Sequence, residues 1–341
     1  MLASTQLPLL AGQVTQADAA NLPNPVVSTL PKNLGFSAAS GDKEFARLSL
    51  NVQAGRSRRL FGDLTATAGG TKAVEWDVKI RCLDESGVQV GARSAASKNH
   101  TTTGAVTISS SLLFTAPRTG SYTCLMTSHT SASDYSLTAQ AGTTFLKASP
   151  VDEGPAQQWH NPDCDSAGQL SSCVYLGGPN PTQRNLLRDD NSVVRPWTAP
   201  SGATTADFRG VLGLTTCFST TASCRSQDRG SSSGSTVSSR FDVTQLNSSG
   251  TPCQVTRGLL VTSTFSKEVH HFTLPLEVDD VPISNACGSR DFTVSIFTGL
   301  VSGNPVKVDG TRNSVPQDPA CATTGPSACE VETWAFAVGN R

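Results

Sequence analysis

The sequence is poor in charged side chains, methionine and aromatic residues, and it contains no long hydrophobic run. Charged residues make up 16% of the 341 residues, against roughly a quarter in ordinary soluble proteins. The formal net charge is -1. Binding to nucleic acid requires clustered Lys and Arg, so we expect no nucleic-acid partner. No stretch approaches the roughly 20 apolar residues that a membrane-spanning helix needs, so we expect no membrane span.

Helical periodicity is also nearly absent, and its best candidate is one or two turns over residues 181–189. Hydrophobic side chains make up 37% of the chain and recur in alternation, which argues against disorder. The clearest alternation covers residues 73–83 and predicts a strand with one buried and one wet face, as antiparallel sheets have. The buried set is Val74, Trp76, Val78, Ile80 and Cys82, and the wet set is Glu75, Asp77, Lys79 and Arg81.

Similar strand-like runs follow one another along both halves of the chain, separated by turns rich in Gly, Pro and Ser. They predict an all-β protein of two antiparallel β-sandwich domains, immunoglobulin-like or jelly-roll-like, with disulfide-stapled loops. We expect a leader or flexible arm over 1–40. A sandwich with one core disulfide follows over 41–149, and a second, loop-rich and disulfide-stapled β domain covers 150–341.

Ten cysteines, beside only two methionines, indicate an oxidising compartment and therefore a secreted or cell-surface protein. Cys82 and Cys124 both fall on inward faces of expected strands, and we expect them to bond across the core between two sheets. This resembles the immunoglobulin architecture, in which a disulfide pins two sheets and a Trp packs nearby. Trp76 departs from that pattern, since it precedes the first cysteine on the same strand. The resemblance covers an architecture and no particular family.

The other eight cysteines all follow residue 160 and allow 105 pairings. Their spacings do not match the C-x2-4-C knuckle of structural zinc, so we expect disulfides, no metal and no cofactor. Close neighbours bracket polar loops, and strand ends at such loops approach to the distance that a disulfide needs. The expected pairs are Cys164–Cys173, Cys217–Cys224, Cys321–Cys329 and, by elimination, Cys253–Cys287.

Signals for catalysis are weak. Residues 230–234 match G-x-S-x-G, yet no hydrophobic strand precedes them and no helix follows, so we interpret them as part of a Ser-rich loop. His270 and His271 could join Asp279 or Asp280 and a serine in a hydrolytic triad, although nothing in the spacing requires it. We therefore assign no catalytic residue, and a secreted hydrolase with a site near these histidines remains the alternative.

The candidate ligand-binding residues are Trp159, His160 and Trp197, which lie in loop-like segments. Exposed Trp rings there could stack on sugar rings. Because aromatic residues are only 6% of the chain, we favour the alternative that Trp159 and Trp197 cover the edge of the second domain's core.

The leading hypothesis is a secreted, non-catalytic binding or structural protein whose partner is an extracellular protein or polysaccharide. Contact would come from disulfide-constrained loops at 155–235 and 310–330, because functional residues concentrate on loops that rigid sheets hold. A further possibility is an inhibitor or toxin accessory subunit that presents the loop between Cys321 and Cys329.

Overall fold

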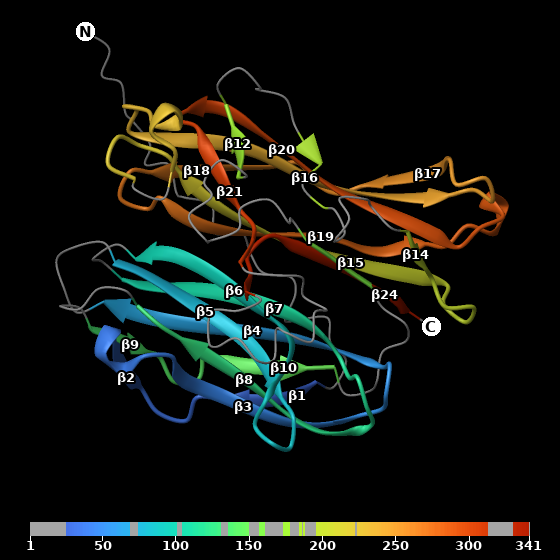
Figure 1. The fold of residues 1–341 in the computed structure, drawn as a ribbon, viewed down its shortest axis with the longest axis horizontal. Coiled ribbons are helices and arrows are strands. Elements are labelled where there is room, and N and C mark those ends of the chain that lie inside the picture. Colours follow the sequence, from blue (N-terminus) through green and yellow to red (C-terminus); the bar gives the residue numbers. More distant parts are fainter. Residues whose placement is uncertain are drawn as a thin grey trace, which may run out of the picture.

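A computed structural model describes residues 25–68, 74–100, 104–130, 136–149, 157–160, 173–177, 184–185, 187, 196–221, 224–312 and 330–340. These residues form an all-β protein with four sheets in two stacks, drawn blue to green and yellow to red in Figure 1. The expected fold class is therefore confirmed. Within 181–189, the described residues Arg184–Asn185 form strand β13 and not a helical turn.

The first sandwich pairs one sheet, in the order β1-β10-β4-β9-β2 with β7 beside β4, with a second sheet that contains β6-β5-β8-β3. Its strands are β1 (Val26–Thr29), β2 (Leu34–Ser37), β3 (Lys43–Val52), β4 (Ser57–Ala68), β5 (Val74–Leu83), β6 (Gln89–His100), β7 (Ala105–Thr115), β8 (Gly120–Ser128), β9 (Ser136–Ala139) and β10 (Phe145–Ala148). The expectation of an arm over 1–40 is wrong for β1 and β2, because both pair within this sandwich.

The second sandwich combines the sheet β11-β24-β15-β21-β12, with β19 beside β15, and the sheet β13-β20-β16-β17, with β14 beside β20 and β18 beside β16. Its strands are β11 (Gln157–His160), β12 (Val174–Leu176), β13 (Arg184–Asn185), β14 (Trp197–Thr198), β15 (Thr205–Thr216), β16 (Gly234–Leu246), β17 (Pro252–Arg257), β18 (Val261–Ser266), β19 (His271–Pro282), β20 (Asp291–Gly303), β21 (Val306–Asp309) and β24 (Trp334–Asn340). Three 3-10 turns complete the described structure: η1 (Ala38–Ser40), η2 (Ser226–Asp228) and η3 (Asn285–Cys287). With three residues each, none of these described turns could span a bilayer.

Strand β5 shows the two faces that its alternation predicts. Trp76 is 1% exposed and Cys82 is fully buried, and both belong to the core of the first sandwich. The opposite face is only partly wet. The Lys79 ammonium lies there, 2.8 Å from a carboxylate oxygen of Asp77 and 3.3 Å from one of Asp42, with its side chain 10% exposed. Alternation located the faces correctly, whereas the degree of exposure depended on neighbouring strands and loops.

The disulfide between Cys82 and Cys124 forms as expected, but not between two sheets. Strands β5 and β8 are adjacent in one sheet, the two cysteines are directly opposite each other, and their Cα atoms lie 4.0 Å apart. Both side chains face inward. An inward-facing cysteine can bond to a partner on the neighbouring strand or to one on the facing sheet, so alternation alone does not distinguish the two. One feature of the immunoglobulin architecture is present: the Tyr122 hydroxyl, two residues before Cys124, donates to the Arg118 carbonyl at 2.6 Å.

The two sandwiches dock against each other. Strand β23 (Glu330–Val331), which pairs with β22 (Thr311–Arg312), adds in parallel to the edge of β6 and so extends a sheet of the first sandwich with second-half residues. Leu113 on β7 joins an apolar cluster formed otherwise by the second sandwich. Beside it, Arg59 and Asp207 form an ion pair at 3.1 Å, with each side chain less than one-fifth exposed. Figure 1 shows β6 and β7, which belong to different sheets of the first sandwich, on the side that faces the second sandwich.

Candidate functional site

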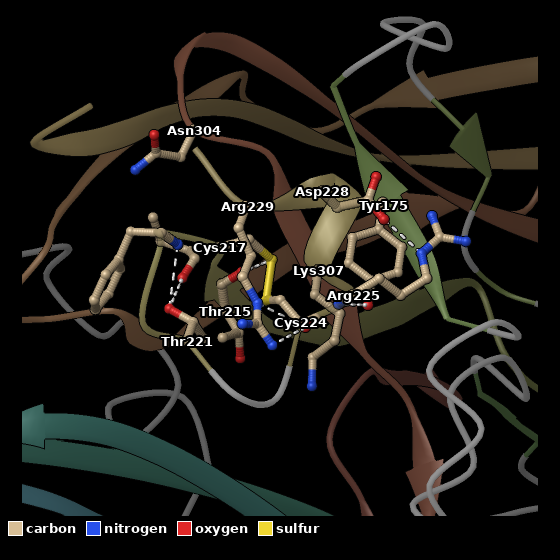
Figure 2. The surroundings of a disulfide bond; sticks show 12 residues. Tyr175, Thr215, Cys217, Thr221, Cys224, Arg225, Asp228, Arg229, Asn304 and Lys307 are labelled. Atoms are coloured by element: carbon tan, nitrogen blue, oxygen red, sulfur yellow. Dashed lines mark hydrogen bonds and ion pairs between the residues drawn. A yellow bond between two sulfur atoms is a disulfide. The ribbon is translucent and has the colours of Figure 1, made fainter. Parts of the chain in front are cut away.

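The disulfide loop, residues 217–221 and 224–234, connects β15 to β16 and is held by a disulfide and by side chains from other strands and loops (Figure 2). Cys217 and Cys224 are fully buried and bonded to each other, as the sequence predicts. Between them, the Thr221 hydroxyl accepts the N–H of Phe218 at 3.2 Å and donates to the carbonyl of Thr216 at 3.3 Å. Internal polar contacts therefore define the conformation of this short segment together with the covalent bond.

Tyr175, on β12, anchors the next turn of the disulfide loop. Its hydroxyl accepts the backbone N–H of Arg225 at 3.0 Å, and the Arg225 guanidinium lies over its ring, 4.1 Å from the centroid. The same guanidinium is paired with the carboxylate of Asp228. Figure 2 shows these three side chains on one side of the disulfide. Because Asp228 neutralises Arg225, this side of the loop carries little net charge.

Asn304 holds the far end of the disulfide loop. Its side-chain oxygen accepts the N–H of Ser232 at 2.8 Å, and its side-chain nitrogen donates to the carbonyl of Ser232 at 2.9 Å. Gly230 lies so close that a Cβ there would be 2.2 Å from the Asn304 oxygen. The match of 230–234 to G-x-S-x-G therefore describes a loop pinned by an asparagine. It runs between η2 and β16, and no helix follows it.

The rim of the disulfide loop carries hydroxyl and amide groups. Ordinary hydrogen bonding is the chemistry that these groups offer, since they can donate and accept without carrying charge. The exposed described side chains of the loop are Ser219, Thr220, Ser226, Gln227, Ser231, Ser232 and Ser233.

His270 and His271 lie at the boundary between the sandwiches, and the structure does not unite them with Asp279 or Asp280. His271 begins the extended strand β19, and eight strand residues span about 26 Å. Asp279 pairs instead with Arg209. The possible triad of a histidine with Asp279 or Asp280 is therefore excluded, because the extended strand β19 holds these residues far apart.

His271 contacts other polar groups. Its Nδ1 lies 3.0 Å from the Thr215 hydroxyl, which donates to a carboxylate oxygen of Asp309 at 2.8 Å. Lys307 lies 2.9 Å from the other oxygen. Burial works to raise the pKa of Asp309, but the Lys307 ammonium prevails and holds that pKa below its ordinary value. A threonine that donates to a carboxylate is not activated by a histidine, so this cluster is not arranged for nucleophilic catalysis.

Two of the three candidate ligand-binding residues belong to the core. Trp159 is fully buried and Trp197 is 3% exposed. The ring of Trp197 packs edge-on against Phe208, with centroids 5.7 Å apart. The prediction that these two rings stack on a sugar is therefore wrong. Both rings belong to the core of the second sandwich, as the alternative role requires. His160 is on β11 beside Trp159, and its side chain lies outside the described structure.

The expected cysteine pairs of the second half are bonded wherever the structure describes both partners. Cys253 and Cys287 are bonded, and they fasten the start of β17 to the turn before β20. Cys173 is disulfide-bonded, while Cys164 and the pair of Cys321 and Cys329 lie outside the described residues. Among the described residues, no group of three or more His, Cys, Asp or Glu side chains could hold a metal ion.

Sequence reasoning missed the residues that shape the disulfide loop from outside. Tyr175 precedes Arg225 by 50 residues, and Asn304 follows Ser232 by 72. No local periodicity or motif links positions so far apart. The only available signal was general: two close cysteines flanking a polar loop, which predicted a constrained loop without indicating its partners.

Comparisons with known proteins assign the chain to no family. No protein-family model matches the chain, and no curated protein matches it in sequence. The N-terminal CBM22-1-CBM22-2 tandem domain of Xyn10C from Paenibacillus barcinonensis is similar at 9% identity and a TM-score of 0.23, over 92% of this chain and 97% of that one.

Two further solved structures have similarly low scores. The stem and receptor binding domain of spike protein P1 from bacteriophage PM2 has 10% identity and a TM-score of 0.25, over 87% of this chain and 96% of that one. A peptide-N(4)-(N-acetyl-β-D-glucosaminyl) asparagine amidase has 8% identity and a TM-score of 0.32, over 93% and 96%. At such scores none of these likenesses carries an argument about function.

Proposed function

We propose that this chain is a non-catalytic, extracellular binding or structural protein that meets its partner through the disulfide loop. Three disulfides between described cysteines support an oxidising compartment, and hence a secreted or cell-surface location. The partner would be an extracellular protein or a polysaccharide, since both offer uncharged hydrogen-bonding groups to a hydroxyl-bearing rim.

The observation that carries this proposal is a set of exposed hydroxyl and amide side chains on a rigid base. The disulfide, the Tyr175 hydroxyl and the Asn304 side chain each hold a different part of the loop. A loop that is already ordered loses less conformational entropy on binding, so its contacts contribute more of their energy to affinity.

The test is a pull-down from native culture fluid and a glycan array, run with the wild type and with Gln227→Lys and Ser231→Lys. Both positions are exposed on the rim, so a bulky charge there should reduce binding at least tenfold without unfolding the protein. The matched control is Ser248→Lys, an equally exposed position in the hairpin turn between β16 and β17. Binding that both rim variants retain in full would reject the disulfide loop as the contact surface.

A further inference from the structure

His271 lies between polar groups of both sandwiches. Its Nε2 is 3.4 Å from a carboxylate oxygen of Glu75, on β5 of the first sandwich, and its Nδ1 is 3.0 Å from the Thr215 hydroxyl, on β15 of the second. The side chain of His271 is 14% exposed and that of Glu75 is 37% exposed. The imidazole therefore bridges the interface, with one ring nitrogen directed to each sandwich.

Counting hydrogens identifies the protonation state that this geometry fits. The Thr215 hydroxyl has one hydrogen, and it donates that hydrogen to Asp309. Its oxygen can therefore only accept from Nδ1 of His271, so Nδ1 carries a hydrogen. A neutral imidazole would then direct its Nε2 lone pair at the Glu75 carboxylate. An imidazolium donates at both nitrogens, and so it alone makes both contacts favourable.

The surrounding charges are consistent with one proton on the histidine pair. The His270 ring is adjacent, with centroids 4.4 Å apart. Burial, and then the neighbouring His271, lower the pKa of His270 to about 4. On β21, Asp309 and Lys307 neutralise each other at 2.9 Å, and Glu332 acts on Lys307 from the turn before β24. From the first sandwich, Glu75 is the described carboxylate that faces Nε2.

We propose that His271 is a proton-dependent latch between the two sandwiches, closed when its imidazole is protonated and bound to Glu75. Loss of the proton removes the Nε2 hydrogen and leaves a lone pair against a carboxylate, which weakens the docking of the sandwiches. At lower pH, protonation of His270 acts in the opposite sense, because burial and the neighbouring His271 lower the pKa of that ring to about 4. Docking is therefore strongest at mildly acidic pH. This inference is independent of the function proposed for the disulfide loop.

The test is a double-mutant cycle on the full, oxidised chain with Glu75→Gln, His271→Gln and the double variant. Thermal unfolding is measured at about pH 5.5 and about pH 8, on either side of the ordinary titration range of histidine. At the lower pH, Glu75→Gln should reduce the unfolding midpoint by about 1–3 °C. This loss should disappear in the His271→Gln background. At the higher pH, Glu75→Gln should leave the midpoint unchanged or raise it.

The matched control is Glu44→Gln, which removes a carboxylate paired at 2.7 Å with Arg47 on the same sheet. Arg47 keeps its charge throughout, so this variant should behave alike at both pH values. An equal effect of Glu75→Gln at both pH values, or additivity with His271→Gln, would overturn the proposal. Should His271→Gln fail to fold, the pH dependence of Glu75→Gln against Glu44→Gln decides the matter, because both variants keep the histidine.

Discussion

Removing the disulfide between Cys82 and Cys124 should destabilise the protein more than removing the bond in the disulfide loop. The first bond joins residues 42 positions apart and the second joins residues 7 apart. Loop closure in the unfolded chain then accounts for about 4 kcal/mol in the first case and about 2.5 kcal/mol in the second. The side chains of all four cysteines are fully buried, so a change to Ala adds about 1–2 kcal/mol of lost packing to each double variant. The difference between the two variants therefore comes from loop length.

The assay is urea unfolding without reductant, followed by Trp fluorescence and far-ultraviolet circular dichroism, for Cys82→Ala/Cys124→Ala and for Cys217→Ala/Cys224→Ala. The first variant should lose about 5–6 kcal/mol of unfolding free energy in the transition of the first sandwich. The strands β5 and β8 remain hydrogen-bonded neighbours, so the fold itself should persist. A smaller loss for the first variant than for the second would refute the reasoning from loop length.

Three further predictions concern the interface, the disulfide loop and pH. Leu113→Ala removes the first sandwich's contribution to the shared apolar cluster. It should lower the unfolding free energy by about 2–4 kcal/mol in denaturant and separate the unfolding transitions of the two sandwiches. A single transition at the wild-type midpoint would contradict this prediction. Gly230→Ala places a methyl group 2.2 Å from the Asn304 oxygen and should lower the melting temperature by several degrees, at a cost of about 1–3 kcal/mol. An unchanged melting temperature would contradict this prediction. The pKa of His270 is lowered from 6.5 to about 4, so its neutral form favours the folded state above pH 6.5 and that contribution is lost as pH falls toward 4. Between pH 6.5 and pH 4, the unfolding free energy of His270→Phe, measured by urea titration, should fall less than that of the wild type. The same dependence of unfolding free energy on pH in both proteins would count against this prediction.

Local sequence patterns were sufficient for the alternating strands and for the disulfide between Cys217 and Cys224. Alternation in β5 depends only on the backbone, whose side chains point to opposite faces at every second residue. The pairing of Cys217 with Cys224 followed from two cysteines around a short polar segment, and Cys253 with Cys287 followed by elimination. These inferences needed no knowledge of which strands are neighbours.

Longer-range arrangement could not be inferred in this way. Alternation places Cys82 and Cys124 inward, but an inward residue can face a neighbouring strand or the opposite sheet. Trp159 and Trp197 sit among turn-forming residues and were candidates for exposure. They are buried because β11 pairs with β24 and β14 with β20, over distances along the chain that no local pattern records.

By itself, then, the sequence determined an all-β chain, its inward faces and its disulfide-rich second half. Tertiary structure alone decided that Cys82 and Cys124 lie in one sheet, that β1 and β2 join the first sandwich, and that Asn304 shapes the disulfide loop. It alone brought His271 to Glu75. The physical reason is that side-chain alternation is a property of each strand, whereas strand order and the docking of sheets depend on the total surface buried when distant segments meet.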